Sequence, residues 1–294
     1  MSELERIKNS GLLSPSFFLP EEKCDFYVSE QRKMLWAILL DLLIEFQRVC
    51  KKHNLTYYAM FGTLLGAIRH KGIIPWDDDL DVAMPRTDYE RLKSLKNEFK
   101  FPYHMTWPDV ESENGYSFIK LRNSETTAMS YAFTHLDIDQ GIFLDIFPYD
   151  EVNEATYYSD QSIIKELLIR NSNNMKMLKN EGVDKDMIRA DILETFHKIE
   201  NLAQKDNGKG YDKIAFRTIS FDPPERLIWS KANHSNSFPM KFEEFEINIP
   251  EGWKKILEVS YGDWKKMPPA EERGIVHANA IFDPNLPYSH YQNQ

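Results

Sequence analysis

The sequence GIIPWDDDLDVAMP, residues 72–85, sets the expected fold and the expected site together. Four aspartates, Asp77, Asp78, Asp79 and Asp81, fall within five positions and run into the apolar residues of a strand. Side chains alternate between the two faces of a strand, so Asp79 and Asp81 are expected on one face. Two ionised carboxylates this close repel each other unless a cation offsets them. Oxygen ligands of this kind favour Mg²⁺ or Mn²⁺.

Three other interpretations of the acidic run stay open at this point. It can be a solvated acidic turn, or a set of structural ion pairs with the nearby cations of residues 69–71. It can also be an EF-hand calcium loop, because the D-x-D-x-D spacing matches the first ligands of that motif. Such a loop would carry Val82 at its sixth position and Asp88 at its twelfth, where glycine and glutamate are usual.

A third carboxylate follows in GIFLDIF, residues 141–147, which is predicted to be a strand. Asp145 is expected on the face opposite Ile142, Leu144 and Ile146. A buried carboxylate is costly unless it faces a cation or transfers a proton, so Asp145 is a candidate third acid of the metal site. The alternative is an aspartate that caps a turn at the strand end.

Two kinds of phosphate-binding feature accompany the acids. Lys120 and Arg122 are expected on one face of a predicted strand, residues 117–122, and paired cations beside a metal site suit phosphate oxygens. A solvated sheet edge explains them equally well. Gly62 and Thr63 join a predicted strand to a predicted helix, where backbone N–H groups can bind an anion.

Length and composition limit the class of protein. The chain has 294 residues, of which 42% are hydrophobic, and its net charge of −10 argues against a broad nucleic-acid surface. The most apolar stretch, residues 34–46, is interrupted by charges and is shorter than a membrane span. With no secretory signal visible, we expect a cytoplasmic protein in which Cys24 and Cys50 are reduced thiols.

The pattern along the chain predicts helices and strands in alternation. The longest helix is expected from an N-cap at Ser29 to His53, with Asn54 ending it in the left-handed conformation. A capping-box pattern at 87–90 predicts the start of another helix, and residues 155–205 are predicted to be mostly helical. Residues 1–28 are expected to be irregular. The predicted strands are 57–61, 80–84, 117–122 and 141–147.

Three segments taken together resemble the LicD family. They are FGTLLGAIRHKGIIPWDDDLDVAMP (61–85), KLRNSET (120–126) and GIFLDIFPYD (141–150), and the likeness extends over roughly residues 30–150. YGDWKKMPP at 261–269 and His277 are similar to the closing segment of the family, with Trp264 where tyrosine is more usual. LicD proteins are phosphotransferases that decorate surface glycans, often with phosphocholine from CDP-choline, and fukutin-related ribitol-phosphate transferases share the first motif.

The resemblance implies an α+β fold with a nucleotidyltransferase-like mixed β-sheet core flanked by helices. It implies an N-terminal extension at 1–28, a catalytic core at 29–150 and a mainly helical acceptor-side region at 151–294. The implied catalytic and metal-binding residues are Asp79, Asp81 and Asp145. The predicted substrate-binding residues are Gly62, Thr63, Arg69, Lys71, Asp77, Lys120, Arg122 and His277.

The expected reaction is Mg²⁺- or Mn²⁺-dependent transfer of phosphocholine from a CDP-linked donor to a glycan hydroxyl. A lipid-linked glycan acceptor would bring the protein to the inner face of a membrane, although no transmembrane span is expected. Two alternatives remain: a nucleotidyltransferase that uses a nucleoside triphosphate, and a catalytically silent module that binds nucleotide or glycan.

Overall fold

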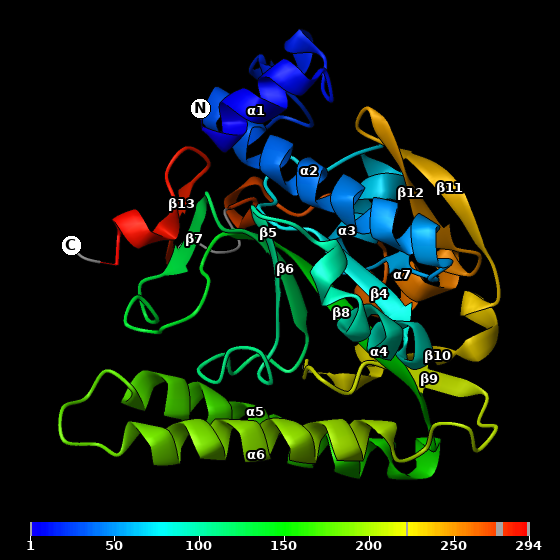
Figure 1. The fold of residues 1–294 in the computed structure, drawn as a ribbon. Helices are drawn as coiled ribbons and strands as arrows, with labels where there is room; N and C mark the ends of the chain where they lie inside the picture. Colours follow the sequence, from blue (N-terminus) through cyan, green and yellow to red (C-terminus); the bar gives the residue numbers. More distant parts are fainter. Residues whose placement is uncertain (1, 222, 275–278, 293–294) are drawn as a thin grey trace.

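The computed structural model of the chain describes residues 2–221, 223–274 and 279–292. A mixed β-sheet lies beneath the long helix α2 (Glu30–His53), and the hairpin formed by α5 (Glu154–Met177) and α6 (Lys185–Gln204) lies at the bottom of the view in Figure 1. This arrangement confirms the predicted α+β class. No helix in the described ranges is long and apolar enough to cross a membrane.

The sheet has seven strands, and its longest strand is the centre of the site. β8 (Ile142–Val152) pairs in parallel with β4 (Asp81–Pro85) and antiparallel with β6 (Ile119–Asn123). The remaining strands of the sheet are β3 (Tyr58–Ala59), β5 (Tyr103–Thr106), β9 (Lys213–Ala215) and β10 (Ile228–Ser230). The strand β8 is therefore longer than the predicted segment 141–147, because its second half pairs with β9.

Helix α2 forms where the sequence predicts it. The Ser29 side chain accepts a hydrogen bond from the Arg32 N–H, and Asn54 ends the helix with φ of 51°. The helix packs against β6 and β8. Its apolar side is buried from Leu35 to Val49. The helix therefore packs on the sheet that carries the acids.

The other elements lie around this core. The remaining helices are α1 (Glu3–Ser10), α3 (Phe61–Arg69), α4 (Arg86–Ser94) and α7 (Trp253–Tyr261). Three small antiparallel pairs join β1 (Glu21–Glu22) with β2 (Tyr27–Val28), β11 (Ser237–Phe242) with β12 (Phe245–Pro250), and β7 (Thr127–Ser130) with β13 (Ala280–Asp283). In Figure 1 the pair of β11 and β12 lies at the right and the pair of β7 and β13 at the left.

Two local predictions are wrong. Residues 1–28 are not all irregular, because α1 forms with a capping box between Ser2 and Glu5 and buries Leu4 and Ile7. The capping box predicted at 87–90 does not form, since the N-cap of α4 is Pro85, two residues before Thr87, and it makes no side-chain cap hydrogen bond. The predicted helical stretch 155–205 is confirmed by α5 and α6, and both cysteines are free thiols.

Residues after 150 complete the main sheet and a strand pair, both of which begin before residue 150. The strands β9 and β10 extend the sheet of β4 and β8, and β13 pairs with β7. The segment after β12 reaches back to α3, with which α7 packs. The region expected on the acceptor side therefore contributes strands as well as helices to the surroundings of the acids.

Candidate active site

The four aspartates gather where the loop before β4 enters the sheet. Asp77 and Asp78 are buried and Asp79 is half-buried, and one carboxylate oxygen from each of the three lies within 4.8 Å of the others. Asp81 opens β4 and lies directly beside Asp145 in the parallel register with β8. The fold therefore brings Asp145 to the acidic run.

Backbone hydrogen bonds from three elements hold this loop. The Arg32 guanidinium and the Trp36 indole N–H, both on α2, donate to the carbonyl oxygen of Asp77 at 2.8 and 3.2 Å. The Asp81 N–H donates to the Thr63 hydroxyl at 2.7 Å, and the Asp145 N–H donates to the Leu80 carbonyl at 3.0 Å. The positions of the acids are thus fixed by hydrogen bonds to their backbone.

Burial and mutual repulsion act together on these acids. Burial raises the pKa of Asp81 well above its usual range, and the carboxylates of Asp79 and Asp145 raise it further. Burial likewise raises the pKa of Asp77, and the adjacent Asp79 adds to the effect. A buried group of oxygen ligands that is short of positive charge fits a hard divalent cation. The carboxylates that converge within 4.8 Å are those of Asp77, Asp78 and Asp79, so Asp79 is the predicted ligand that lies in this group. Of the other two predicted ligands, Asp81 follows at the start of β4 and Asp145 is paired with Lys120.

Lys120 is the cation nearest to Asp145. Its Nζ lies 2.5 Å from the Asp145 carboxylate oxygen Oδ1, and the two residues face each other across β6 and β8. Burial lowers the pKa of Lys120, while Asp145 opposes that shift. The ammonium group also lies 3.6 Å from the centre of the Phe143 ring. Lys120 is therefore paired with the third acid rather than open to solvent.

The first turn of α3 faces the acids. Gly62 and Thr63 lie inside the helix rather than before it, and the first intrahelical bond runs from Leu64 N–H to the Met60 carbonyl. The amides that precede this bond form the anion-binding end of the helix. A Cβ atom at position 62 would lie 2.7 Å from an Asp77 carboxylate oxygen, so only glycine allows this close approach.

Arg69 and Lys71 go to different places. The Arg69 guanidinium donates to the backbone carbonyls of Trp264 at 3.0 Å and Lys266 at 3.3 Å. Arg69 thus fastens the C-terminal segment beside the acids. Lys71 lies on the exposed surface with its Nζ 3.9 Å from the Met240 sulfur on β11, and the structure does not bring it to the acids. His277 lies outside the described residues.

The acids open into a cavity of about 630 Å³, which we call the nucleotide cavity after the donor that the sequence predicts. One wall carries Gly62 and the acids Asp77, Asp79 and Asp81, and the other is the segment 261–269. Burial raises the pKa of Tyr261 on that segment, and the acids raise it further. Reasoning from the residues alone did not single out Tyr261, Asp263 or Arg32; for the first two, the YGDW segment was the available signal.

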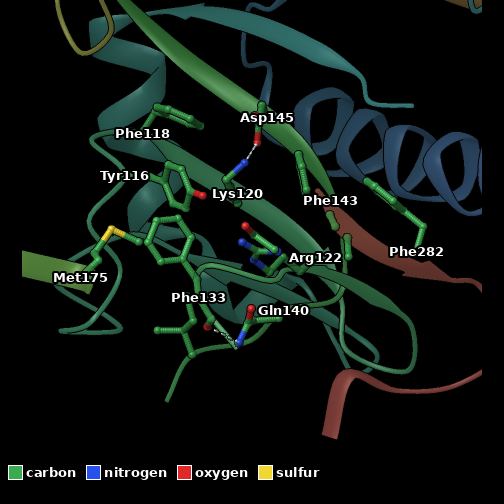
Figure 2. A pocket seen from close by; sticks show the side chains of 14 residues that line it. Tyr116, Phe118, Lys120, Arg122, Phe133, Gln140, Phe143, Asp145, Met175 and Phe282 are labelled. Atoms are coloured by element: carbon green, nitrogen blue, oxygen red, sulfur yellow. Dashed lines mark hydrogen bonds and ion pairs between the residues drawn. The ribbon is translucent and has the colours of Figure 1, made fainter. Parts of the chain in front are cut away.

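A second cavity of about 220 Å³ lies beside Asp145 and is shown in Figure 2. We call it the Arg122 cavity, because the guanidinium of Arg122 points into it. Lys120 and Asp145 line it as well, together with the aromatic residues Tyr116, Phe118, Phe133, Phe143 and Phe282. The two cavities share no lining residue: one is lined by Asp81 and the other by its strand neighbour Asp145.

Similarity to known proteins covers the same residues. Residues 54–181 match the domain family described as LicD/FKTN/FKRP, nucleotidyltransferase domain. The chain is 28% identical over 258 residues to the lipopolysaccharide cholinephosphotransferase LicD of Haemophilus influenzae, covering 83% of this chain and 95% of that protein. The four clustered aspartates and Asp145 all lie within the matched domain.

Two further relatives share shorter segments. An uncharacterised protein of Rickettsia prowazekii is 29% identical over 159 residues, which cover 52% of this chain and 56% of that protein. Mannosyltransferase regulator 4 of Saccharomyces cerevisiae is 25% identical over 116 residues, which cover 37% of this chain and 9% of that protein.

Proposed function

We propose that the chain, which matches the LicD domain family over residues 54–181, is a phosphotransferase that moves phosphocholine from CDP-choline to a hydroxyl of a cell-surface glycan precursor. The similarity to a lipopolysaccharide cholinephosphotransferase supports phosphocholine as the group and a glycan as the acceptor. The observation that carries the proposal is the register of β4 and β8, which sets Asp81 beside Asp145 within a buried acidic cluster.

The proposal includes a divalent metal, Mg²⁺ or Mn²⁺, held by Asp79 and Asp81, with Asp145 as the proton acceptor. When bound, such a metal would offset the negative charge of a diphosphate and stabilise the charge that develops on the leaving phosphate. The fit rests on the all-oxygen ligand set and on the raised pKa of Asp81, which burial and the neighbouring acids cause. Asp77 supports the cluster through its contact with Asp79.

The donor and the acceptor are assigned to different cavities. The donor nucleotide occupies the nucleotide cavity, where the amides at the first turn of α3 face its phosphates. The acceptor hydroxyl attacks the phosphorus that carries choline, a new phosphorus–oxygen bond forms, and the bond to CMP breaks. Asp145 receives the hydroxyl proton, and Lys120 holds its carboxylate in place at 2.5 Å.

A thermal-shift series tests the donor class. A ligand that binds only the folded protein raises the melting temperature by mass action. We expect CDP-choline to stabilise the wild-type chain in the presence of Mg²⁺ and to lose most of that effect in an Asp79→Asn variant. Asp186→Asn, a change at a fully exposed side chain of α6, is the matched control and should respond like the wild type.

The other outcomes separate the alternatives. Stronger stabilisation by a nucleoside triphosphate than by CDP-choline would indicate nucleotidyl transfer. A response to no nucleotide would indicate a silent binding module. With a lipid-linked acceptor, the proposal also places the protein at the inner face of a membrane.

A further inference from the structure

Arg122 is buried but has no ion-pair partner within the described part of the chain. Its exposed fraction is 4%, and its guanidinium donates one hydrogen bond, to the Gly141 carbonyl at 2.9 Å. The Nε atom has no hydrogen-bond partner among the described residues. A buried guanidinium that is only partly bonded is costly, and an anion that enters the cavity would remove that cost.

The aromatic walls of the Arg122 cavity are already in contact with cations of the protein. The Lys120 ammonium lies 3.6 Å from the ring centre of Phe143 and 4.8 Å from that of Tyr116. The Arg122 guanidinium carbon lies 5.2 Å from the Phe143 ring centre. Two cations, Lys120 and Arg122, and one carboxylate, Asp145, line the cavity, and Glu111 interacts with Arg122 from outside this lining. A trimethylammonium group would meet repulsion here, whereas an anionic group would be attracted.

The size of the cavity limits its occupant to about one ring. An apolar cavity of about 150 Å³ is large enough to hold benzene. The volume of about 220 Å³ therefore suits a single sugar ring with a substituent and is too small for a whole nucleotide. Gln140 and Ser130 offer polar atoms on the wall, and the aromatic rings offer flat surfaces for the faces of a sugar.

The position of the cavity decides which substrate it takes. In an in-line displacement the attacking and leaving oxygens lie on opposite sides of the phosphorus, so the two substrates need separate spaces that meet at the reacting atoms. The nucleotide cavity is lined by Asp81, and the Arg122 cavity is lined by its neighbour Asp145. The acceptor hydroxyl is therefore delivered beside Asp145 if the acceptor sugar occupies the Arg122 cavity.

We propose that the Arg122 cavity binds the acceptor sugar through an acidic substituent, a phosphate or a carboxylate, which the Arg122 guanidinium holds. This inference rests on the proposed function for its assignment to the acceptor. The acid–guanidinium contact makes Arg122 a determinant of acceptor specificity, so acceptors that carry an acidic sugar are preferred over neutral ones.

The test measures binding of small probes to the metal-free full-length protein by saturation-transfer NMR. Omitting metal and donor prevents phosphate from binding through a cation at the acids, and it makes the result independent of whether the protein transfers phosphocholine. The probes are glucose 6-phosphate, glucuronate, glucose and choline. We expect the two acidic sugars to bind at least tenfold more tightly than glucose, and the tighter of the two identifies the acid as phosphate or carboxylate.

Three variants locate the binding. Arg122→Gln should weaken the acidic probes at least tenfold, and Arg122→Lys, which keeps the charge, should retain part of the affinity. Ala280→Phe fills the cavity from β13 without touching a charge and should also weaken them, so the test does not depend on a buried arginine variant folding. Equal affinity of the acidic probes for Arg122→Gln and the wild type would overturn the inference. So would choline binding that Ala280→Phe abolishes.

Discussion

Asp81 and Asp145 lie side by side on parallel strands, with their side chains on the same face of the sheet. Only one of them has a direct cationic partner among the described residues, since Lys120 pairs with Asp145. Burial and the neighbouring acids raise the pKa of Asp81, which means that the metal-free fold disfavours the ionised form. The residues that would hold the metal thus destabilise the metal-free protein.

Replacing Asp81 by asparagine tests whether this residue lowers the stability of the metal-free protein while it is required for activity. The Asp81 carboxyl binds its proton more strongly in the folded state than in the unfolded state. Its contribution to the free energy of unfolding therefore falls as the pH rises above the ordinary aspartate pKa of about 4. At pH 7 without metal, we expect Asp81→Asn to be more stable by on the order of 1 kcal/mol. The advantage should shrink as the pH falls toward 4, while transfer activity falls at least about 100-fold.

Denaturant unfolding in EDTA at several pH values measures the effect. Asp186→Asn removes a carboxylate from the surface and should change neither quantity. A metal-free Asp81→Asn protein that is less stable than the wild type at pH 7 would show that the cluster is balanced by contacts of its own and needs no cation.

At the scale of elements, the sequence predicts what depends on local signals and misses what depends on distant ones. The cap at Ser29 and the apolar stripe behind it were enough to predict α2. The signal for α1, a serine at position 2 followed by Glu5, was also present but was overlooked. Helix α4 begins at Arg86, which pairs locally with Glu90 but also with Asp150 and Glu200, and a local pattern does not reveal these distant partners.

Arg86 joins the sheet to the helical hairpin. Its guanidinium makes two hydrogen bonds to Asp150 on β8, at 2.8 and 2.7 Å, and two to Glu200 on α6, at 3.1 and 2.8 Å. All three side chains are buried. We expect Arg86→Met to destabilise the protein by about 3–5 kcal/mol, because it leaves the buried Asp150 without its cation and Glu200 with Lys93 at 3.4 Å.

Chemical denaturation of Arg86→Met against the wild type measures that loss. Arg91→Met, at an exposed ion pair on the same helix, is the control and should cost less than about 1 kcal/mol. A loss of similar size in both variants would show that the link between β8 and α6 contributes no more than a surface pair.

The candidate site shows the same difference between features that depend on local signals and features that depend on distant ones. The spacing of Asp79 and Asp81 predicted two neighbouring acids without any structure. The sequence also selected Asp145, but its place beside Asp81 follows from the pairing of β4 with β8, which links residues 64 positions apart. The pairing of Lys120 with Asp145 and the two hydrogen bonds from Arg69 to the C-terminal segment could not be read from the sequence, because each joins elements that only the fold brings together.

At the scale of the whole molecule, the site is assembled from nearly the full length of the chain. Arg32 near the start of α2 fixes the acidic loop, β8 supplies the third acid, and the segment 261–269 closes the nucleotide cavity. The central claim is that this assembly transfers phosphocholine to a glycan with release of CMP.

The most direct measurement follows the phosphorus itself. The purified chain is incubated with CDP-choline, Mg²⁺ and lipopolysaccharide that lacks phosphocholine, and ³¹P NMR records the products. We predict that a glycan phosphodiester and CMP appear together in equal amounts, that EDTA stops both, and that Asp79→Asn forms neither while Asp186→Asn forms both. Persistence of the full reaction in Asp79→Asn, or turnover of a nucleoside triphosphate to pyrophosphate with CDP-choline left intact, would contradict the account.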